Sequence, residues 1–330
     1  MIDLTSYTTF GLPARAAELV EIQSVEELAA LGERIRRERM PYYILGRGAN
    51  VIFRGDFPGL VIRYADASLR VEEHDDYVVL VASAAQDWCA FVETASQLGW
   101  GVECLAGIPG TVGAAPIQNI GAYGAEVKDT IRCVRSYDLL EGGLRERSVA
   151  ELEFGYRDSL FKHALGQREL IYEVEFRLER RCFHAERLLR LGYSEGELEG
   201  LTPLRVCERV LRIRGEKLPD VARIGSAGSF FKNPVVPREL ADGLLEVYPG
   251  MPTYPAGDGL VKLSAAWLLD TDGWKGRRVG GAGVWHLQPL VLVNHGGATV
   301  EGVLALAEEI RASVRARFGV ELEREVNVVG

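Results

Sequence analysis

Apolar residues recur at helical spacing in several parts of the chain. Ser24-Val25-Glu26-Glu27 matches the capping-box pattern, and Leu28, Leu31 and Ile35 then fall on one face of a helix. A second helix is predicted to begin at Asp87 and to end before Gly99. Further helical signals lie within 264–269 and 300–318, where Gly319 is a suitable residue to end the last helix.

Short apolar runs between these helices are typical of strands. Ile171–Leu178 alternates apolar and polar residues as a half-buried strand does. Strands are also predicted at 42–45, 51–53, 60–62, 77–81 and 321–329. The pattern therefore predicts a mixed fold of helices and strands. The polar stretch 180–199 looks like a boundary or an insertion.

Three segments rich in small residues follow neither period. A glycine-broken loop spans 46–50, and longer runs of small residues span 107–124 and 225–234. An ordinary surface loop is the simpler interpretation. However, loops as long as 107–124 usually serve a function, and glycines let a backbone approach a ligand closely. We therefore favour ligand binding for this segment.

Composition sets broad limits on function. A chain of 330 residues suggests two or three domains, and 47% hydrophobic with 26% charged residues is ordinary for a globular protein. Subtracting 47 acidic from 38 basic residues leaves a net charge of −9, which argues against a general nucleic-acid binder. A local basic pocket for a phosphorylated small molecule remains compatible with this charge.

Nothing in the sequence suggests a membrane span, a secretory signal or a disulfide framework. Five scattered cysteines form no Cys-x-x-Cys pair, so reduced thiols in a cytoplasmic protein are expected. The five histidines, among them His184, lack metal-ligand spacing. We expect no metal, no nucleic-acid partner and no membrane association.

Standard nucleotide and hydrolase motifs are absent. Gly46-Arg47-Gly48 lacks the third glycine of a dinucleotide fingerprint, and no phosphate-binding P-loop sequence occurs. Ser229 precedes Phe230-Phe231 rather than completing a nucleophile elbow. What remains is a set of small-residue loops whose backbone N–H groups can cradle a pyrophosphate.

Several segments together resemble one family. They are Thr9-Phe10-Gly11, Leu45-Gly46-x-Gly48-x-Asn50-Val51, Gly107-Ile108-Pro109-Gly110-Thr111-Val112-Gly113, Gln118-Asn119-Ile120-Gly121-Ala122-Tyr123-Gly124, Tyr156-Arg157-Asp158-Ser159-x-Phe161-Lys162, Lys217-Leu218-Pro219-Asp220, Gly228-Ser229-Phe230-Phe231-Lys232-Asn233-Pro234 and Glu323-x-Glu325-Val326. In this order they resemble the UDP-N-acetylenolpyruvoylglucosamine reductases, also called UDP-N-acetylmuramate dehydrogenases. Tyr193 resembles the tyrosine loop of the larger subtype.

The resemblance implies an α+β fold: an FAD-binding domain of the vanillyl-alcohol oxidase and CO-dehydrogenase (PCMH) type, plus a C-terminal α+β substrate domain. It assigns residues 1–65 with 318–330 to a first FAD-binding lobe and 66–210 to a second. Residues 211–317 would form the UDP-sugar domain.

The same resemblance implies the reaction. Non-covalent FAD, reduced by NADPH as co-substrate, would pass a hydride to the enolpyruvyl group of UDP-N-acetylglucosamine enolpyruvate, in peptidoglycan precursor synthesis. We expect a monomer, with NADPH and the substrate sharing one cleft.

Three residues match the family's catalytic positions. Ser229 would donate the proton, Arg157 would clamp the substrate carboxylate with its planar fork, and Glu325 would polarise the enol or position Ser229. From residue type alone, Ser229 could be a turn residue and Arg157 a surface ion pair. Glu325 could equally be an exposed acid on a terminal strand.

Further residues are implied as ligand contacts. The substrate contacts are Tyr156, Tyr193, Lys217, Gly228, Asn233 and Gln288. The FAD contacts are Leu45, Gly46, Arg47, Gly48, Ala49, Asn50, Val51, Ile108, Pro109, Gly110, Thr111, Gly113, Ala114, Ala115, Gln118, Asn119, Gly121, Ala122, Tyr123, Gly124 and Ile171. Simpler roles are a turn for Asn233 and a core aromatic for Tyr156.

Two other functions stay open from the residues. The chain could be another oxidoreductase of the same flavin superfamily, acting on a different substrate. It could also be a non-catalytic sensor of a UDP-sugar or a flavin. A pure binder has no need of a proton donor, so the joint presence of Arg157, Ser229 and Glu325 disfavours the sensor.

Overall fold

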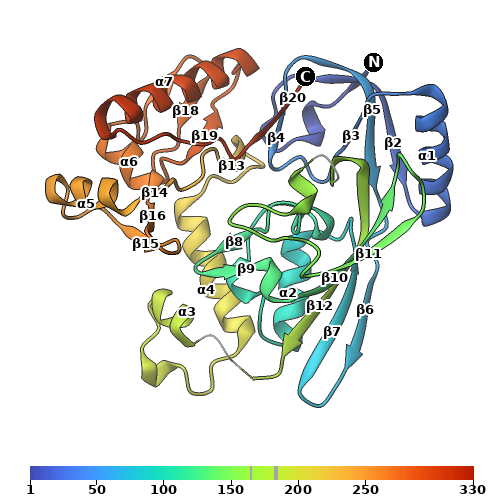
Figure 1. The fold of residues 1–330 in the computed structure, drawn as a ribbon, viewed down its shortest axis with the longest axis horizontal. Helices are drawn as coiled ribbons and strands as arrows, with labels where there is room; N and C mark the ends of the chain where they lie inside the picture. Colours follow the sequence, from blue (N-terminus) through green and yellow to red (C-terminus); the bar gives the residue numbers. More distant parts are fainter. Residues whose placement is uncertain (164–165, 182–184) are drawn as a thin grey trace. The chain divides into compact units, whose positions relative to one another are not determined.

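The computed structural model describes residues 1–163, 166–181 and 185–330, so Cys182 and His184 lie outside the described residues. The chain divides into two compact units (Figure 1). Unit 1 comprises Met1–Ala16, Gly48–Phe57 and Lys217–Gly330, and unit 2 comprises Ala17–Arg47 and Pro58–Glu216. The three-part functional division given above remains a prediction.

A small α/β layer opens unit 2. Strands β2 (Arg15–Ile22), β5 (Asp56–Tyr64) and β3 (Tyr42–Ile44) lie side by side, with β3 parallel to β5. Helix α1 (Val25–Glu38) begins where expected, because the Ser24 hydroxyl accepts the Glu27 N–H at 3.2 Å. The predicted apolar face of α1 is buried against Leu60 and Ile62, which confirms the helix.

The main sheet of unit 2 has five antiparallel strands in the order β11-β10-β12-β7-β6. The strands are β6 (Leu69–Glu73), β7 (Tyr77–Ser83), β10 (Ile131–Asp138), β11 (Leu144–Ser148) and β12 (Glu169–Glu179). Helix α2 (Trp88–Leu98) follows Asp87 as predicted and buries Phe91 against Phe176, with ring centroids 4.7 Å apart. Helix α4 (Pro203–Lys217) contributes Val206 and Val210 to the same core.

Short elements complete unit 2. They are η2 (Glu103–Leu105), η3 (Val112–Ala114), β8 (Gly121–Ala122), β9 (Ala125–Glu126), η4 (Val127–Asp129), η5 (Leu160–Lys162), η6 (Gly166–Arg168), α3 (Ala185–Arg190) and η7 (Glu195–Glu197). The stretch 107–124 therefore contains one 3₁₀ turn and a two-residue strand rather than loop alone. The polar stretch 180–199 lies inside unit 2.

Unit 1 has two small antiparallel sheets and three helices around one core. The sheets are β13 (Gly225–Ser229), β19 (Val291–Asn294), β18 (Ala282–Val284) and β17 (Arg278–Val279), and β14 (Val235–Pro237), β16 (Leu260–Leu263) and β15 (Thr253–Pro255). The helices are α5 (Arg238–Val247), α6 (Ala265–Thr271) and α7 (Val300–Phe318). Gly319 ends α7 at φ 68°, which confirms that prediction.

Near the termini, η1 (Thr5–Tyr7) follows β1 (Ile2–Asp3), and β4 (Val51–Phe53) pairs in parallel with β20 (Asn327–Val329). The predicted strand at 321–329 is correct only over its last three residues. The preceding segment makes a single bridge, Phe231 to Arg324.

The segment 225–234 differs from its prediction as a loop. Its first half is strand β13, which pairs antiparallel with β19. Because the residues of β13 are small, the strand shows no alternation of hydrophobic and polar residues and cannot be predicted from that pattern. Small residues are required here because the neighbouring backbone lies very close. A Cβ at Gly225 would lie 2.0 Å from the Phe10 carbonyl oxygen, so only glycine fits there.

Within the described ranges, no helix is long and apolar enough to cross a membrane. Within the described residues, Cys89, Cys104, Cys133 and Cys207 form no disulfide.

Gly225→Ala should lower the free energy of unfolding by about 3 kcal/mol, because the new methyl group forces β13 away from the Phe10 backbone. Gly243→Ala is the control: this exposed glycine of α5 has nothing within 4 Å of a Cβ, and the change should add about 0.5–1 kcal/mol. Urea unfolding followed by tryptophan fluorescence measures both. Equal midpoints for the two variants would contradict the crowding argument.

Candidate active site

Two of the predicted FAD-contact segments meet in unit 2. A Cβ at Gly46 would lie 3.1 Å from the Thr111 hydroxyl, so residues 45–47 lie against the loop 108–115. Arg47 forms an ion pair with Asp87. Asp87 also caps α2 by accepting the Ala90 N–H at 3.0 Å, and the Trp88 N–H donates to Gly110. The start of α2 therefore anchors both segments.

This corner of unit 2 offers donors to an anion. Among the described residues, no protein acceptor takes the N–H groups of Gly46, Arg47 or Gly110. Gly110 has φ 153°, and nothing lies within 4 Å of the position of its missing Cβ. Backbone N–H groups that have no protein acceptor, with open space at Gly110, suit a pyrophosphate, so these residues fit the FAD expected from the sequence.

Asn119 organises the second predicted FAD-contact segment, 118–124. The side chain is fully buried and the backbone has φ 44°. Its amide donates to the Gly155 carbonyl oxygen at 2.9 Å and to Glu126 at 3.1 Å, while its oxygen accepts the Lys128 N–H at 3.2 Å. One side chain thus joins three segments of the loop region.

Arg157 lies directly against this segment. Its guanidinium donates to the carbonyl oxygens of Gly121 at 2.5 Å and Asn119 at 3.4 Å, and it lies 5.5 Å from the centre of the Tyr156 ring. The Lys162 ammonium donates to the Arg157 carbonyl oxygen at 3.0 Å. The predicted carboxylate clamp is therefore held beside the predicted flavin loop.

Backbone strain concentrates in the same place. Five non-glycine residues of the described chain have positive φ. Asn119, Tyr123 and Arg157 lie in these segments, and Glu153 lies shortly before Arg157. Left-handed conformations cost non-glycine residues roughly 1–2 kcal/mol each. Such strain persists where surrounding contacts over-determine it, and it is typical of functional sites.

Ser229 lies in unit 1, at the end of β13. The pairing register with β19 shifts between Ser226 and Ser229, and Gly228 within this bulge has φ 73°. Phe230 and Phe231 behind it are fully buried and fix the strand. Ser229 itself is exposed, and its hydroxyl has no hydrogen-bond partner among the described residues. The bulge thus presents a serine hydroxyl on the surface of a rigid strand.

Glu325 is paired with the same strand. Its N–H donates to the Phe230 carbonyl oxygen at 2.9 Å, and its carbonyl oxygen accepts from the Asn50 amide at 3.3 Å. Asn327 donates to the Asn50 carbonyl oxygen. The structure thus brings Ser229, Glu325 and Asn50 into one part of unit 1, whereas Arg157 belongs to unit 2.

Gly48 is held tightly in unit 1. It has φ 67°, and a Cβ there would lie 2.1 Å from the Tyr7 carbonyl oxygen. Thr9 donates its N–H to the Gly48 carbonyl oxygen at 3.1 Å and its hydroxyl to the Ser226 carbonyl oxygen at 2.6 Å. The motif Thr9-Phe10-Gly11 therefore links Gly48 to the strand that carries Ser229.

The predicted substrate contacts are divided between the units. In unit 1, Asn233 accepts the Ala265 N–H at 2.9 Å, Gln288 accepts the Leu290 N–H, and the Lys217 carbonyl oxygen accepts from Trp285. In unit 2, the Tyr193 hydroxyl donates to the Arg205 carbonyl oxygen at 3.4 Å. Each residue has a local role, and its assignment as a ligand contact stays a prediction.

Sequence reasoning did not identify Arg214. Its Nε donates to the Gly107 carbonyl oxygen at 3.2 Å, at the start of the first flavin segment. It also lies beside Tyr123 of the second segment; burial raises the pKa of Tyr123, and the guanidinium opposes that rise. Burial lowers the pKa of Arg214 itself. No local motif marks this arginine, because its role arises from the packing of α4.

Comparison with known proteins gives a consistent result. Residues 219–329 match a family described as UDP-N-acetylenolpyruvoylglucosamine reductase, C-terminal domain, and residues 16–143 match an FAD binding domain. UDP-N-acetylenolpyruvoylglucosamine reductase of Chromobacterium violaceum is 48% identical over 98% of this chain and 96% of its own. The enzyme of that name from Pseudomonas putida is 44% identical over 99% and 97%.

Among solved structures, the UDP-N-acetylenolpyruvylglucosamine reductase of Thermus caldophilus aligns with a TM-score of 0.69 at 27% identity, covering 100% of this chain and 98% of that one. These findings confirm the predicted α+β class with an FAD-binding domain and a C-terminal domain, and they confirm FAD as the expected cofactor.

Asn119→Ala should weaken FAD binding and lower the free energy of unfolding by about 2–4 kcal/mol, since it removes the buried hydrogen bonds and leaves a strained backbone. Asn119→Gly is the matched control: it loses the same bonds but tolerates φ 44°, and should be less destabilised by about 1 kcal/mol. Chemical unfolding and the FAD content per chain measure the two effects. Full FAD content and unchanged stability in both variants would contradict the role of Asn119.

Proposed function

Because this chain belongs to the UDP-N-acetylenolpyruvoylglucosamine reductase family, we propose that it reduces UDP-N-acetylglucosamine enolpyruvate to UDP-N-acetylmuramate with electrons from NADPH. It is an FAD-dependent oxidoreductase of peptidoglycan precursor synthesis. The observation that carries the detailed proposal is the exposed Ser229 hydroxyl beside the paired Glu325 segment.

The chemistry supplied by FAD when bound is hydride transfer, from NADPH and then to the terminal carbon of the enolpyruvyl group. In unit 2, Gly46, Arg47 and Gly110 would hold the pyrophosphate through backbone N–H groups, and Asn119 keeps the second loop in shape. The other residues proposed to contact FAD are Gly48 to Val51, which belong to unit 1, and the remaining predicted contacts, which belong to unit 2. A backbone cradle does not need hydroxyl side chains at Ala49, Ala114 or Ala115.

Hydride addition leaves negative charge on the α-carbon and on the adjoining carboxylate, so this charge requires cationic and proton-donating groups. Ser229 would deliver its proton to the α-carbon. A hydroxyl is a weak acid, but a carbanion conjugated with a carboxylate is a strong enough base to take its proton. Glu325 would orient the Ser229 hydroxyl from the neighbouring segment, and Arg157 would hold the substrate carboxylate with its fork.

The other predicted contacts complete the proposal. Lys217 would neutralise charge on the substrate diphosphate, while Asn233, Gln288 and Gly228 would contact the sugar nucleotide beside Ser229. Tyr156 would line the substrate side of the flavin, and Tyr193 would belong to the tyrosine loop of the larger subtype. We further propose a cytoplasmic monomer with two flavin-binding lobes and a substrate domain.

Ser229→Ala should retain FAD and be reduced by NADPH at the wild-type rate, but the reduced enzyme should pass its electrons to the enolpyruvyl substrate at least about 100-fold more slowly. Anaerobic stopped-flow absorbance separates the two half-reactions. Ser6→Ala, a substitution of another exposed serine of unit 1, should change neither rate. Normal substrate reduction by the Ser229 variant would reject Ser229 as the proton donor.

A further inference from the structure

The pairing of β13 with β19 contains one extra residue just before Ser229. Ser226 lies opposite Val293 and Ser229 lies opposite Val291, so three steps along β13 match two steps along β19. Gly228, immediately before Ser229, has φ 73°. A left-handed glycine followed by a residue that shares its partner is the geometry of a G1 β-bulge. The bulge therefore decides which register position Ser229 takes.

This register position decides where the Ser229 hydroxyl points. Side chains alternate between the two faces of a strand, so a shift by one residue turns a side chain to the opposite face. In the observed register Ser229 is exposed, while Ala227 and Phe230 are buried in the core of unit 1. Loss of the bulge would move Ser229 by one position and turn its hydroxyl to the other face. The proton donor proposed above therefore needs the bulge.

The buried hydroxyl of Ser226 holds the bulge. It accepts the Gly228 N–H at 3.1 Å. A β-bulge interrupts the ladder of hydrogen bonds between its two strands, and here a hydroxyl of the same strand accepts the N–H of the bulged residue. Because Ser226 is 1% exposed, solvent does not compete for this bond on the Ser226 side.

Ser226 is itself fixed by the N-terminal segment. Its N–H donates to the Thr9 carbonyl oxygen at 3.0 Å, and its carbonyl oxygen accepts from the Thr9 hydroxyl at 2.6 Å. A Cβ at the preceding Gly225 would lie 2.0 Å from the Phe10 carbonyl oxygen, so the backbone has no room to shift in that direction. The acceptor that holds Gly228 is therefore a fixed point.

The chain beyond the bulge is anchored independently. The Phe230 N–H donates to the Leu290 carbonyl oxygen at 2.7 Å, and the Phe230 carbonyl oxygen accepts the Glu325 N–H at 2.9 Å. The bulge thus lies between two anchored points. Nothing lies within 4 Å of the position of the missing Cβ of Gly228, so side-chain packing does not hold this residue. The hydrogen bond to the Ser226 hydroxyl holds it instead.

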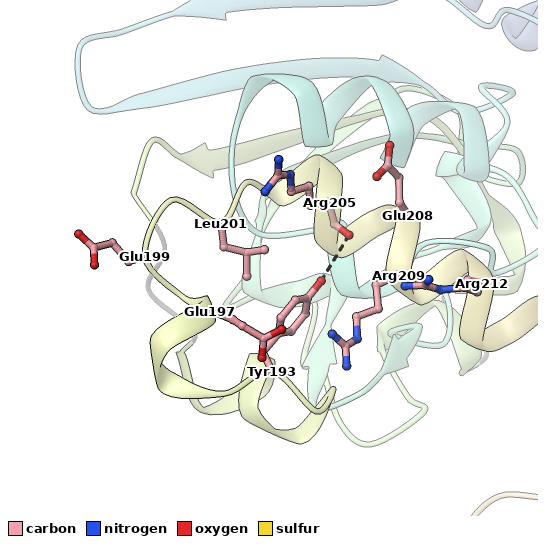
Figure 2. A pocket seen from close by; sticks show the side chains of 8 residues that line it. All are labelled: Tyr193, Glu197, Glu199, Leu201, Arg205, Glu208, Arg209 and Arg212. Carbon is pink, nitrogen blue, oxygen red and sulfur yellow. Dashed lines mark hydrogen bonds between the residues drawn. The ribbon is translucent and has the colours of Figure 1, made fainter.

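The surroundings of Tyr193, another predicted functional side chain, are more open. Figure 2 shows its ring in a solvent-open hollow of about 710 Å³ beside α4. The Tyr193 hydroxyl reaches the Arg205 carbonyl oxygen at 3.4 Å, and the guanidinium groups of Arg205, Arg209 and Arg212 point apart. These side chains do not converge on one ligand. The tight anchoring before Ser229 is therefore not a general feature of the predicted site residues.

We propose that Ser226 is a positioning residue for substrate reduction: its hydroxyl fixes the bulge at Gly228 and so orients the Ser229 hydroxyl for proton transfer. This inference rests on the proposed function, in which Ser229 donates the proton. Ser226 is buried and acts through Gly228, so its effect is confined to the step that uses Ser229. Hydride transfer from NADPH to FAD precedes that step and does not depend on it.

Anaerobic stopped-flow absorbance on the FAD-loaded protein tests the proposal. NADPH should reduce Ser226→Ala at the wild-type rate. The reduced variant should then pass its electrons to the enolpyruvyl substrate about 10–100-fold more slowly, since a small displacement of a reacting group costs up to about 100-fold in rate. Ser226→Thr retains the hydroxyl and should keep the wild-type rate. A wild-type rate in the alanine variant, or equal losses in both variants, would overturn the proposal.

Thr299→Ala is the matched control for stability. The Thr299 hydroxyl accepts the Gly302 N–H at 3.0 Å at the start of α7, in the same unit. This variant therefore also loses one bond between a hydroxyl and a backbone N–H. Both alanine variants should unfold at lower urea concentrations than the wild type, but only Ser226→Ala should slow substrate reduction. Equal slowing in both would reveal a general effect of stability and overturn the assignment.

A double-mutant cycle tests whether Ser226 acts through Ser229. Ser229→Ala removes the proposed donor, so adding Ser226→Ala should slow substrate reduction no further. A further loss as large as that of the single variant would show that Ser226 acts by another route, and the proposal would be wrong. If Ser226→Ala does not fold, Ser226→Cys replaces it and must show the same selective loss, because a thiol accepts hydrogen bonds only weakly.

The proposed function fails separately. Normal substrate reduction by Ser229→Ala would reject the proton donor itself, and with it the need for a positioning residue. Slow reduction by Ser229→Ala together with normal reduction by Ser226→Ala would reject only the role of Ser226 and leave the proposed function standing.

Discussion

The close approach of three backbone segments around Thr9 is the constraint on which unit 1 depends. The Thr9 N–H and hydroxyl reach the Gly48 and Ser226 carbonyl oxygens, and a Cβ at Gly48 or Gly225 would overlap the backbone of residues 7–10. Main-chain groups packed this tightly tolerate almost no displacement. A predicted flavin loop, the N-terminal segment and the strand carrying Ser229 are therefore fixed as one body, and Glu325 joins them by pairing with Phe230 and Asn50.

In unit 2, separate loop segments are held together by the buried side-chain amide of Asn119. The Asn119 side chain joins these segments through three hydrogen bonds, two donated by its amide nitrogen and one accepted by its oxygen. The Asn119 backbone carbonyl oxygen in turn accepts a hydrogen bond from Arg157. The left-handed backbone at Asn119, Tyr123 and Arg157 is the conformational cost of that arrangement. This backbone strain lies next to the Arg157 guanidinium. Its presence there is consistent with selection for the geometry of a functional site rather than for stability alone.

Elements with a strong local signal are predictable from the amino-acid sequence alone. Ser24, Asp87 and Gly319 mark helix ends through their own side chains or backbone freedom, and they locate α1, α2 and α7. Strand β13 is not predictable in this way, because its small residues are required by crowding against Phe10 and carry no alternation. The loop at 118–124 is marked by its motif, but the joining role of Asn119 depends on Gly155, which is 36 positions away. Arg214 escapes sequence reasoning for the same reason: its significance comes from the way α4 packs.

An acidic protein that binds several anions must keep some of its cations from being neutralised. In this chain many arginines pair with carboxylates, as Arg135 and Arg168 do, and these pairs supply little net field. Arg209 and Arg214 each donate to a backbone carbonyl oxygen, of Gly192 and of Gly107. A carbonyl dipole fixes the direction of a guanidinium but leaves its unit charge in place. The positive field is thus focused at a few positions along the flavin loops and α4, and a net charge of −9 elsewhere does not prevent anionic ligands from binding there.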